Sequence, residues 1–223
     1  MPPRPWLVFL SIGTASVIVF AFFVLRLQPI KTRPTAAETA ALAPITSPTV
    51  TFADPVRGAA KAKVTLVEYA DFQCEACKEL SDNLTAAMRS YPDTVRLVWK
   101  DMPNEGAHPL ATLASIAAGC AGRQGKFWEY HDLLFDRQTY LSEDEFSKIA
   151  TELQLNAESF KACYDAHDTL AVVKRDFQEG QALKILATPT IFVGSESYAG
   201  SLTVDELSSM IKKALAATPA AAK

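Results

Sequence analysis

The sequence predicts an α/β fold into which a helical subdomain is inserted. Short runs rich in β-branched and aromatic residues, typical of buried strands, alternate with segments of helical periodicity. Between the second and third expected strands lie roughly 85 residues that are almost wholly helical, whereas a parallel crossover needs only about a dozen. This excess length indicates an added group of helices rather than a simple connection.

The composition and charge narrow the class of protein. Of the 223 residues, 49% are hydrophobic and 21% are charged, as in an ordinary globular protein. The formal net charge is −3, but residues 1–33 hold four basic residues and no acid, so the remaining 190 residues carry −7. An acidic domain binds nucleic acid poorly because phosphate neutralisation needs clustered Lys and Arg. Nucleic acid is therefore excluded as a partner.

The amino-terminal region predicts one transmembrane helix. Residues 6–25 are uncharged and long enough to cross a bilayer. A cleaved signal peptide is the alternative, although its apolar region is shorter and a small-x-small triplet occurs only at 41–43. Basic residues after the span favour a cytoplasmic domain by the positive-inside rule, whereas the cysteines described below indicate the opposite orientation. We expect an anchor over 1–30 and a Pro/Ala/Thr-rich linker over 31–52.

The folded domain is expected over residues 53–218, and it begins with a strand, a helix and a second strand. Residues 63–70 and 95–100 have the composition of buried strands. Between them a helix is expected to begin at Cys74 and to end before Tyr91. Its apolar side chains repeat at helical spacing: Cys77, Leu80, Leu84 and Met88.

The inserted helices are expected at about 104–186. One of them has an apolar stripe of helical spacing: Leu113, Ile116, Ala117 and Cys120. Ser142 and Glu145 form a capping box that opens another helix, and Asn156 is the expected cap of the next. A third strand at 190–193, a short strand at 197–199 and a final helix at 204–216 complete the domain.

The pair Cys74-Glu-Ala-Cys77 stands directly between an expected strand and an expected helix. At a helix amino terminus, unpaired N–H groups and the helix dipole stabilise a thiolate, so Cys74 is the expected nucleophile. Cys77 lies one turn further on and would resolve a mixed disulfide. Half of a zinc site is the alternative, but structural zinc usually needs a second close pair of ligands. We therefore favour redox chemistry and expect no metal.

Two further cysteines, Cys120 and Cys163, each occupy the fourth position of an apolar stripe on separate inserted helices. They are either two buried, inert thiols or a structural disulfide that joins these helices. A structural disulfide persists only in an oxidising compartment. Because a membrane anchor is also expected, we favour the disulfide and a domain that faces the periplasm or the cell exterior.

Three segments carry a family pattern: VEYADFQCEACK at 67–78, QGKFWEYHDLLF at 124–135 and ATPTIFVG at 187–194. Together they resemble the DsbA-like thiol-disulfide oxidoreductases of the thioredoxin superfamily, especially the membrane-tethered bacterial forms. The resemblance extends over roughly 54–215 and implies a thioredoxin-like fold that contains the helical insert. It also implies a disulfide oxidase that acts on exported proteins with free cysteines and is reoxidised by a quinone-linked membrane protein.

The resemblance also implies roles for residues outside the cysteine pair. Pro189 matches the cis-proline that lies against the pair, and Thr188 would offer its backbone to a substrate peptide. Glu68 matches a buried acid that exchanges a proton with Cys77, with an edge-facing surface glutamate as the alternative. Lys100 is a candidate ion-pair partner of Glu68 across neighbouring strands, with a solvated lysine as the alternative.

One departure from the family pattern concerns Glu75, which stands where many members have proline and is expected to disfavour the thiolate of Cys74. This change predicts a milder oxidant than the strongest relatives. A reductase or isomerase of the same fold, and a non-catalytic thioredoxin-like binding module, remain alternatives. No cofactor is expected, and the absence of an added dimerisation domain favours a monomer.

Overall fold

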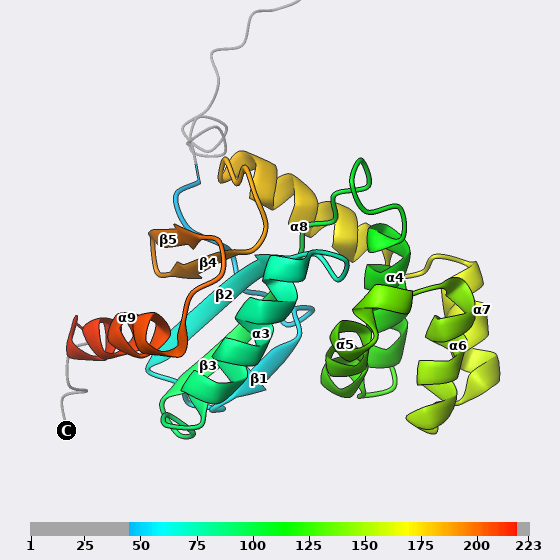
Figure 1. The fold of residues 1–223 in the computed structure, drawn as a ribbon, viewed down its shortest axis with the longest axis horizontal. Coiled ribbons are helices and arrows are strands. Elements are labelled where there is room, and N and C mark those ends of the chain that lie inside the picture. Colours follow the sequence, from blue (N-terminus) through cyan, green and yellow to red (C-terminus); the bar gives the residue numbers. More distant parts are fainter. Residues whose placement is uncertain (1–44, 218–223) are drawn as a thin grey trace, which may run out of the picture. The chain divides into compact units, whose positions relative to one another are not determined.

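The computed structural model describes residues 45–217. Their centre is a five-stranded sheet with the order β1-β3-β2-β4-β5, in which β2 and β3 are parallel and the other neighbours are antiparallel (Figure 1). The strands are Val56–Gly58 (β1), Val64–Ala70 (β2), Val95–Asp101 (β3), Thr190–Val193 (β4) and Glu196–Ala199 (β5). The α/β class is therefore confirmed, and the strands expected after residue 63 are present.

The expected transmembrane helix at 6–25 lies outside the described residues. Among residues 45–217, none of the helices combines the length and the apolar character that a membrane crossing requires.

Helices cover both faces of the sheet. Helix α3 (Glu75–Met88) and helix α9 (Val204–Ala217) pack together on one face. Their shared core includes Leu66 of β2, Leu84 of α3 and Leu207 of α9, all almost completely buried. Helix α8 (Leu170–Ala182) packs against β3 on the other face, where Tyr69 and Phe192 belong to a separate core. Both faces of the central strands are covered, so successive apolar residues such as Leu66 and Val67 are both buried.

The long helical stretch forms a subdomain beside the sheet (Figure 1). Its elements are α4 (Ala111–Gly122), α5 (Phe127–Asp136), a short 3-10 helix η1 (Gln138–Tyr140), α6 (Glu143–Glu152) and α7 (Ala157–Asp165). The two expected caps are confirmed, since Ser142 accepts a hydrogen bond from the Glu145 N–H and Asn156 accepts one from the Ser159 N–H. These contacts satisfy N–H groups that the first helical turn leaves unpaired.

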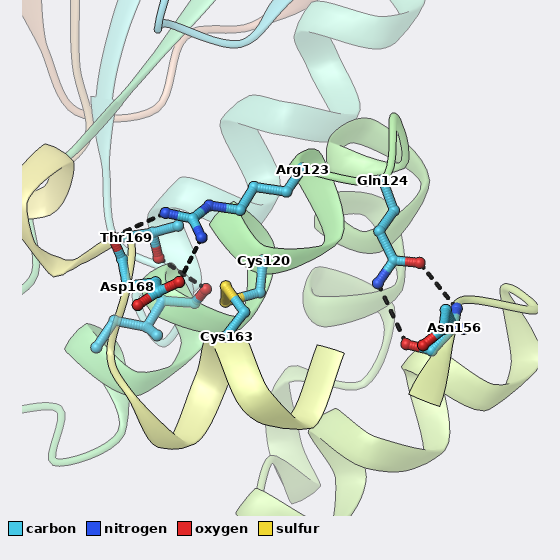
Figure 2. The surroundings of a disulfide bond; sticks show 8 residues. Cys120, Arg123, Gln124, Asn156, Cys163, Asp168 and Thr169 are labelled. Atoms are coloured by element: carbon cyan, nitrogen blue, oxygen red, sulfur yellow. Dashed lines mark hydrogen bonds and ion pairs between the residues drawn. A yellow bond between two sulfur atoms is a disulfide. The ribbon is translucent and has the colours of Figure 1, made fainter. Parts of the chain in front are cut away.

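A disulfide joins Cys120 of α4 to Cys163 of α7, with 5.8 Å between their Cα atoms (Figure 2). Polar contacts between the same two parts of the insert surround it. They are an ion pair of Arg123 with Asp168, and two hydrogen bonds between the Gln124 side chain and the backbone of Asn156. Covalent and polar links therefore hold α4 and the region of α7 together.

The register of the sheet corrects the expected pair of Glu68 with Lys100. Glu68 is aligned with Trp99, whereas Lys100 is aligned with Tyr69. Because successive side chains of a strand point to opposite faces, Lys100 faces α8 and not Glu68. Its buried ammonium group forms ion pairs with three carboxylates: Asp54 at 3.1 Å, Asp176 at 3.3 Å and Glu179 at 3.2 Å. The predicted pair was therefore wrong, and Lys100 instead links β3 to α8 and to the segment before β1.

Strand β1 was not expected from the sequence. It has only three residues and pairs antiparallel with β3. Gly58 ends it with a φ of +105°, and a Cβ atom there would lie 2.6 Å from the carbonyl oxygen of Val95. This close approach to the Val95 carbonyl oxygen requires a glycine at position 58. The sequence did not predict β1 because a strand of three residues is too short to show an alternating pattern.

Candidate active site

Cys74 is the residue immediately before α3, and its backbone is extended (φ −80°, ψ 119°). Cys74 is the N-cap residue of α3, and its carbonyl oxygen accepts hydrogen bonds from the N–H groups of Cys77 and Lys78. A hydrogen bond from the Cys77 side chain lowers the pKa of Cys74 to about 6; partial burial opposes this, and the Cys77 backbone N–H assists it. A thiol of this kind is largely ionised at neutral pH and is therefore a nucleophile.

Cys77 lies one turn into the helix and is completely buried. Burial is the largest cause that raises its pKa above the usual range of a thiol, followed by the hydrogen bond with Cys74. Both cysteines are free thiols in this structure. The two sulfur atoms thus differ in the way thiol-disulfide exchange needs, because the partly exposed Cys74 attacks or is attacked while the buried Cys77 stays protonated.

The loop before β4 lies against the nucleophile. The peptide bond between Thr188 and Pro189 is cis, and the carbonyl oxygen of Thr188 is 3.5 Å from the Sγ atom of Cys74. The sequence separation between Cys74 and Thr188 is 114 residues, so the antiparallel pairing of β4 with β2 brings them together. A substrate sulfur atom that approaches Cys74 therefore comes close to the backbone of this loop.

Glu68 is completely buried on the face of β2 that carries α3. Among the described residues, neither of its carboxylate oxygens has a hydrogen-bond partner. Burial raises its pKa to about 8, while the charge of Arg57 lowers it and that of Cys74 raises it. A carboxyl group with this pKa holds a proton at neutral pH and can give it to a strong base nearby. The charge of Glu68 also raises the pKa of Cys77, which indicates that the two groups interact.

The turn that presents Cys74 is held by side chains that the sequence analysis did not single out. Asp71 accepts hydrogen bonds from the N–H groups of Gln73 and Asn104, and it contacts the His108 ring at 2.8 Å. The Gln73 side chain in turn accepts a hydrogen bond from the Leu110 N–H at 2.6 Å. An aspartate that directly follows a strand and accepts a hydrogen bond from the N–H two residues on is a recognisable turn signal. That signal was available for Asp71, whereas the partners 33 to 37 residues away were not readable.

Gln138 of the 3-10 helix adds a second support from the insert. Its amide nitrogen donates to the carbonyl oxygens of Phe72 and Cys74, each at 2.9 Å. It therefore connects the insert directly to the residue that carries the nucleophile. Nothing in the local sequence of Gln138 indicates this contact, because its partners lie 64 and 66 residues earlier.

The acid whose charge most disfavours the Cys74 thiolate is Asp71 and not Glu75, the acid expected from the sequence. The charge of Asp71, which is buried, raises the pKa of Cys74. Glu75 is exposed on the first turn of α3, where solvent screens its charge. Among the described residues, no group of three or more His, Cys, Asp or Glu side chains is arranged to hold a metal ion.

A reactive cysteine before a helix, a buried partner one turn later and a cis-proline loop beside both define a thiol-disulfide exchange site. A mixed sheet with helices on both faces positions it. A family model described as thioredoxin matches residues 51–213, so the chain belongs to the thioredoxin family. Within that superfamily it is a DsbA-like protein, as its similarity to solved oxidoreductase structures of 26% identity shows. The resemblance seen in the sequence is thereby confirmed.

Solved structures of similar fold include a thioredoxin-like oxidoreductase from Silicibacter pomeroyi DSS-3, with a TM-score of 0.65 and 26% identity over 75% of this chain and 95% of that one. BdbD from Bacillus subtilis in its oxidised form has a TM-score of 0.65 and 26% identity over 74% and 94%. The catalytic domain of Proteus mirabilis ScsC has a TM-score of 0.64 and 26% identity over 81% and 96%.

Curated relatives by sequence include much longer proteins. The Na(+)/H(+) antiporter NhaA 3 of Salinispora tropica is 33% identical over 163 residues, which are 73% of this chain and 25% of that protein. The Na(+)/H(+) antiporter NhaA 1 of Salinispora arenicola is 33% identical over 165 residues, or 74% and 25%. The chain thus spans about a quarter of the length of these relatives.

Proposed function

We propose that this chain is a disulfide oxidase that donates a Cys74–Cys77 disulfide to exported proteins. The observation that carries the proposal is the contrast between the two thiols, of which Cys74 has a pKa lowered to about 6 and Cys77 a raised one. A stabilised Cys74 thiolate favours the reduced form of the pair, and a pair that prefers to be reduced is an oxidant of other thiols.

The reaction begins from the oxidised pair. A substrate thiolate attacks the Sγ atom of Cys74, a bond forms between those two sulfur atoms, and the Cys74–Cys77 bond breaks. Cys77 leaves with the electron pair and takes a proton from Glu68, whose pKa of about 8 keeps it protonated at neutral pH. A second substrate thiolate then attacks the substrate sulfur of the mixed disulfide, and Cys74 leaves as a thiolate. The substrate loses two electrons and the pair gains them.

The oxidised pair must then be regenerated. A quinone-linked membrane protein is the proposed oxidant, because it accepts two electrons from the Cys74 and Cys77 thiols. We place the domain outside the cytoplasm, attached through the uncharged segment 6–25. The disulfide of Cys120 with Cys163 supports this placement, since such bonds persist in oxidising compartments.

Replacing Cys77 by alanine tests the proposed nucleophile and the kind of substrate. In cells that make the full-length Cys77→Ala chain, the Cys74 thiolate attacks disulfides of exported proteins and releases one substrate thiolate each time. The resulting mixed disulfides should accumulate, because the resolving thiol is gone. Non-reducing electrophoresis and mass spectrometry of the adducts measure this. The matched Cys74→Ala/Cys77→Ala chain should form none.

Two outcomes would contradict the proposal. An absence of adducts favours a binding module, and adducts made only of cytoplasmic proteins would place the domain on the other side of the membrane. The reduction potential of the full-length chain separates an oxidase from a reductase: a value well above about −270 mV, that of thioredoxin, is expected.

A further inference from the structure

The loop after β3 places a histidine against the turn that carries Cys74. His108 lies in this loop, and its Nδ1 atom is 2.8 Å from the Oδ2 atom of Asp71. The Asp71 side chain is completely buried, whereas the His108 side chain is 26% exposed. Solvent can therefore deliver a proton to the imidazole although it does not reach the carboxylate. The mechanism above gives His108 no role.

Asp71 is a fixed negative charge beside the nucleophile. Its carboxylate accepts hydrogen bonds from the N–H groups of Gln73 and Asn104, each at 2.8 Å, and its carbonyl oxygen accepts one from the Cys74 N–H at 3.0 Å. A buried charge acts strongly on its neighbours because little water screens it. The charge of Asp71 raises the pKa of Cys74. Any group that offsets this charge therefore stabilises the Cys74 thiolate.

His108 is the side chain that can offset the Asp71 charge. Within residues 45–217, no other side chain forms an ion pair or a hydrogen bond with the Asp71 carboxylate, whose remaining partners are backbone N–H groups. An imidazole gains or loses a proton between about pH 5 and 8. A neutral ring can donate one hydrogen bond to the carboxylate, and a protonated ring donates the same bond and adds a positive charge.

Other charged groups lie around His108 and the cysteine pair. Glu105 belongs to the same loop as His108, and Lys174 of α8 lines a cavity together with Glu105. Glu68 of β2 has a pKa of about 8, and Glu75 of α3 is exposed. These groups are common to the parent protein and to a variant of His108. Their contributions therefore cancel when the two proteins are compared at the same pH.

From these contacts, and resting on the oxidase function proposed above, we infer that His108 is a positioning residue whose protonation, acting through Asp71, keeps Cys74 ionised in mildly acidic surroundings. Asp71 transmits the effect, because it contacts both the ring and the backbone of Cys74. A stabilised thiolate favours the reduced form of the pair, so the pair is a stronger oxidant at low pH than it would be without the imidazole.

His108→Asn tests the inference in the full-length chain. The asparagine amide keeps a hydrogen-bond donor near the place of Nδ1, but it cannot gain a proton. Parent and variant are equilibrated with glutathione buffers at pH 6 and pH 8, and the reduced fraction of Cys74 and Cys77 is measured by alkylation and mass spectrometry. At pH 6 we expect the equilibrium constant for reduction of the pair to be about threefold higher in the parent, a moderate effect because solvent partly screens the ring. At pH 8, where an imidazole is largely neutral, the two constants should agree.

The ultraviolet absorbance of the Cys74 thiolate is a second readout, which a packing role of His108 would not change in this pH-dependent way. On acidification, the thiolate of the parent should persist to a lower pH than that of His108→Asn. The matched control is His167→Asn, at an exposed position of the insert with a φ of +51°, which asparagine adopts readily. It should match the parent at both pH values.

Two results would overturn the inference. Equal constants for the parent and His108→Asn at pH 6 would show that the ring has no influence on the pair. A difference of the same size at pH 6 and pH 8 would assign the effect to packing and not to a proton. The proposed function fails separately, if the parent itself has a reduction potential near that of thioredoxin. The comparison at pH 6 then still decides the role of His108.

Discussion

At the scale of single residues, the site depends on three groups whose pKa values differ from those of the free amino acids. Cys74 is ionised near neutral pH, whereas Cys77 and Glu68 hold their protons. The causes are local: a hydrogen bond stabilises one thiolate, and burial destabilises the other two charges. Glu68, whose charge interacts with Cys77, therefore holds a proton for the sulfur atom that must receive one when the disulfide opens.

Glu68 gives the first prediction, which concerns stability against pH. Its pKa is about 8 in the folded protein and 4.5 in the unfolded chain, so the folded protein binds this proton more tightly. The corresponding stability is complete below about pH 4.5 and is lost as the pH rises through about 8. Glu68→Gln, which stays neutral, should be more stable than the parent at pH 8 by about 2 to 4 kcal/mol. Urea unfolding of the reduced proteins at several pH values measures the difference.

The comparison with Glu68→Gln is necessary because Asp101 titrates in the same range: burial raises its pKa to about 7. That contribution is common to both proteins and cancels in the difference. Glu79→Gln, on the exposed side of α3, is the matched control and should follow the parent at every pH. A difference between parent and Glu68→Gln that does not change with pH would show that the carboxyl is not buried as described.

At the scale of elements, the helical insert forms hydrogen bonds with the active-site turn of the sheet and so restrains it, in addition to packing beside it. The loop before α4 supplies the N–H groups that bind Asp71 and Gln73, and η1 supplies Gln138. A thioredoxin-type sheet and helix lacking these contacts would present Cys74 on a less restrained turn. Restraint of this kind keeps the sulfur in line with the Thr188 carbonyl oxygen.

Gln138→Ala tests this support. The change leaves the carbonyl oxygens of Phe72 and Cys74 without their side-chain donor, so we expect a loss of about 1 to 3 kcal/mol in the free energy of unfolding. Thr139→Ala alters the exposed neighbour and should change the free energy by less than about 0.5 kcal/mol. If both variants lose the same amount, the hydrogen bonds of Gln138 do not stabilise the turn.

At the scale of the whole molecule, the disulfide between Cys120 and Cys163 closes a separation of 43 residues in the insert. In the chain-entropy model, a loop of this length stabilises the fold by roughly 4 kcal/mol. Replacing both residues by alanine, with Cys74 and Cys77 also replaced by alanine, should lower the urea midpoint accordingly. The parent for this comparison carries only the Cys74→Ala and Cys77→Ala changes.

A reductant distinguishes the bond from the packing of its two side chains. Reduction should lower the urea midpoint of that parent toward the value of the variant without Cys120 and Cys163, and it should not affect the variant. A parent whose midpoint is insensitive to reductant would mean that the bond contributes little. The bond would then restrain α4 relative to α7 in an oxidising compartment without raising the free energy of unfolding.

Most elements were predictable because their signals are local. The caps at Ser142 and Asn156 bond N–H groups three residues away, and the apolar stripe of α4 repeats within one helix. Strand β1 was missed because its three residues have no pattern, and its place depends on pairing with β3. The predicted pair of Lys100 with Glu68 was wrong because two side chains on neighbouring strands share a face only in one register. The sequence of a single strand does not reveal the register between β2 and β3.

The amino-acid sequence by itself determined the order of the strands after residue 63, most of the helices, the pair Cys74 and Cys77, and the two cysteines that form the disulfide, Cys120 and Cys163. It could do so because periodicity, capping and the position of a cysteine before a helix act over a few residues. The tertiary structure alone decided which groups surround Cys74 and Cys77: the Thr188 carbonyl oxygen, Asp71 with its partners, and Gln138. These groups come from segments up to 114 residues apart, and only the packing of the sheet, α8 and the insert sets their distances.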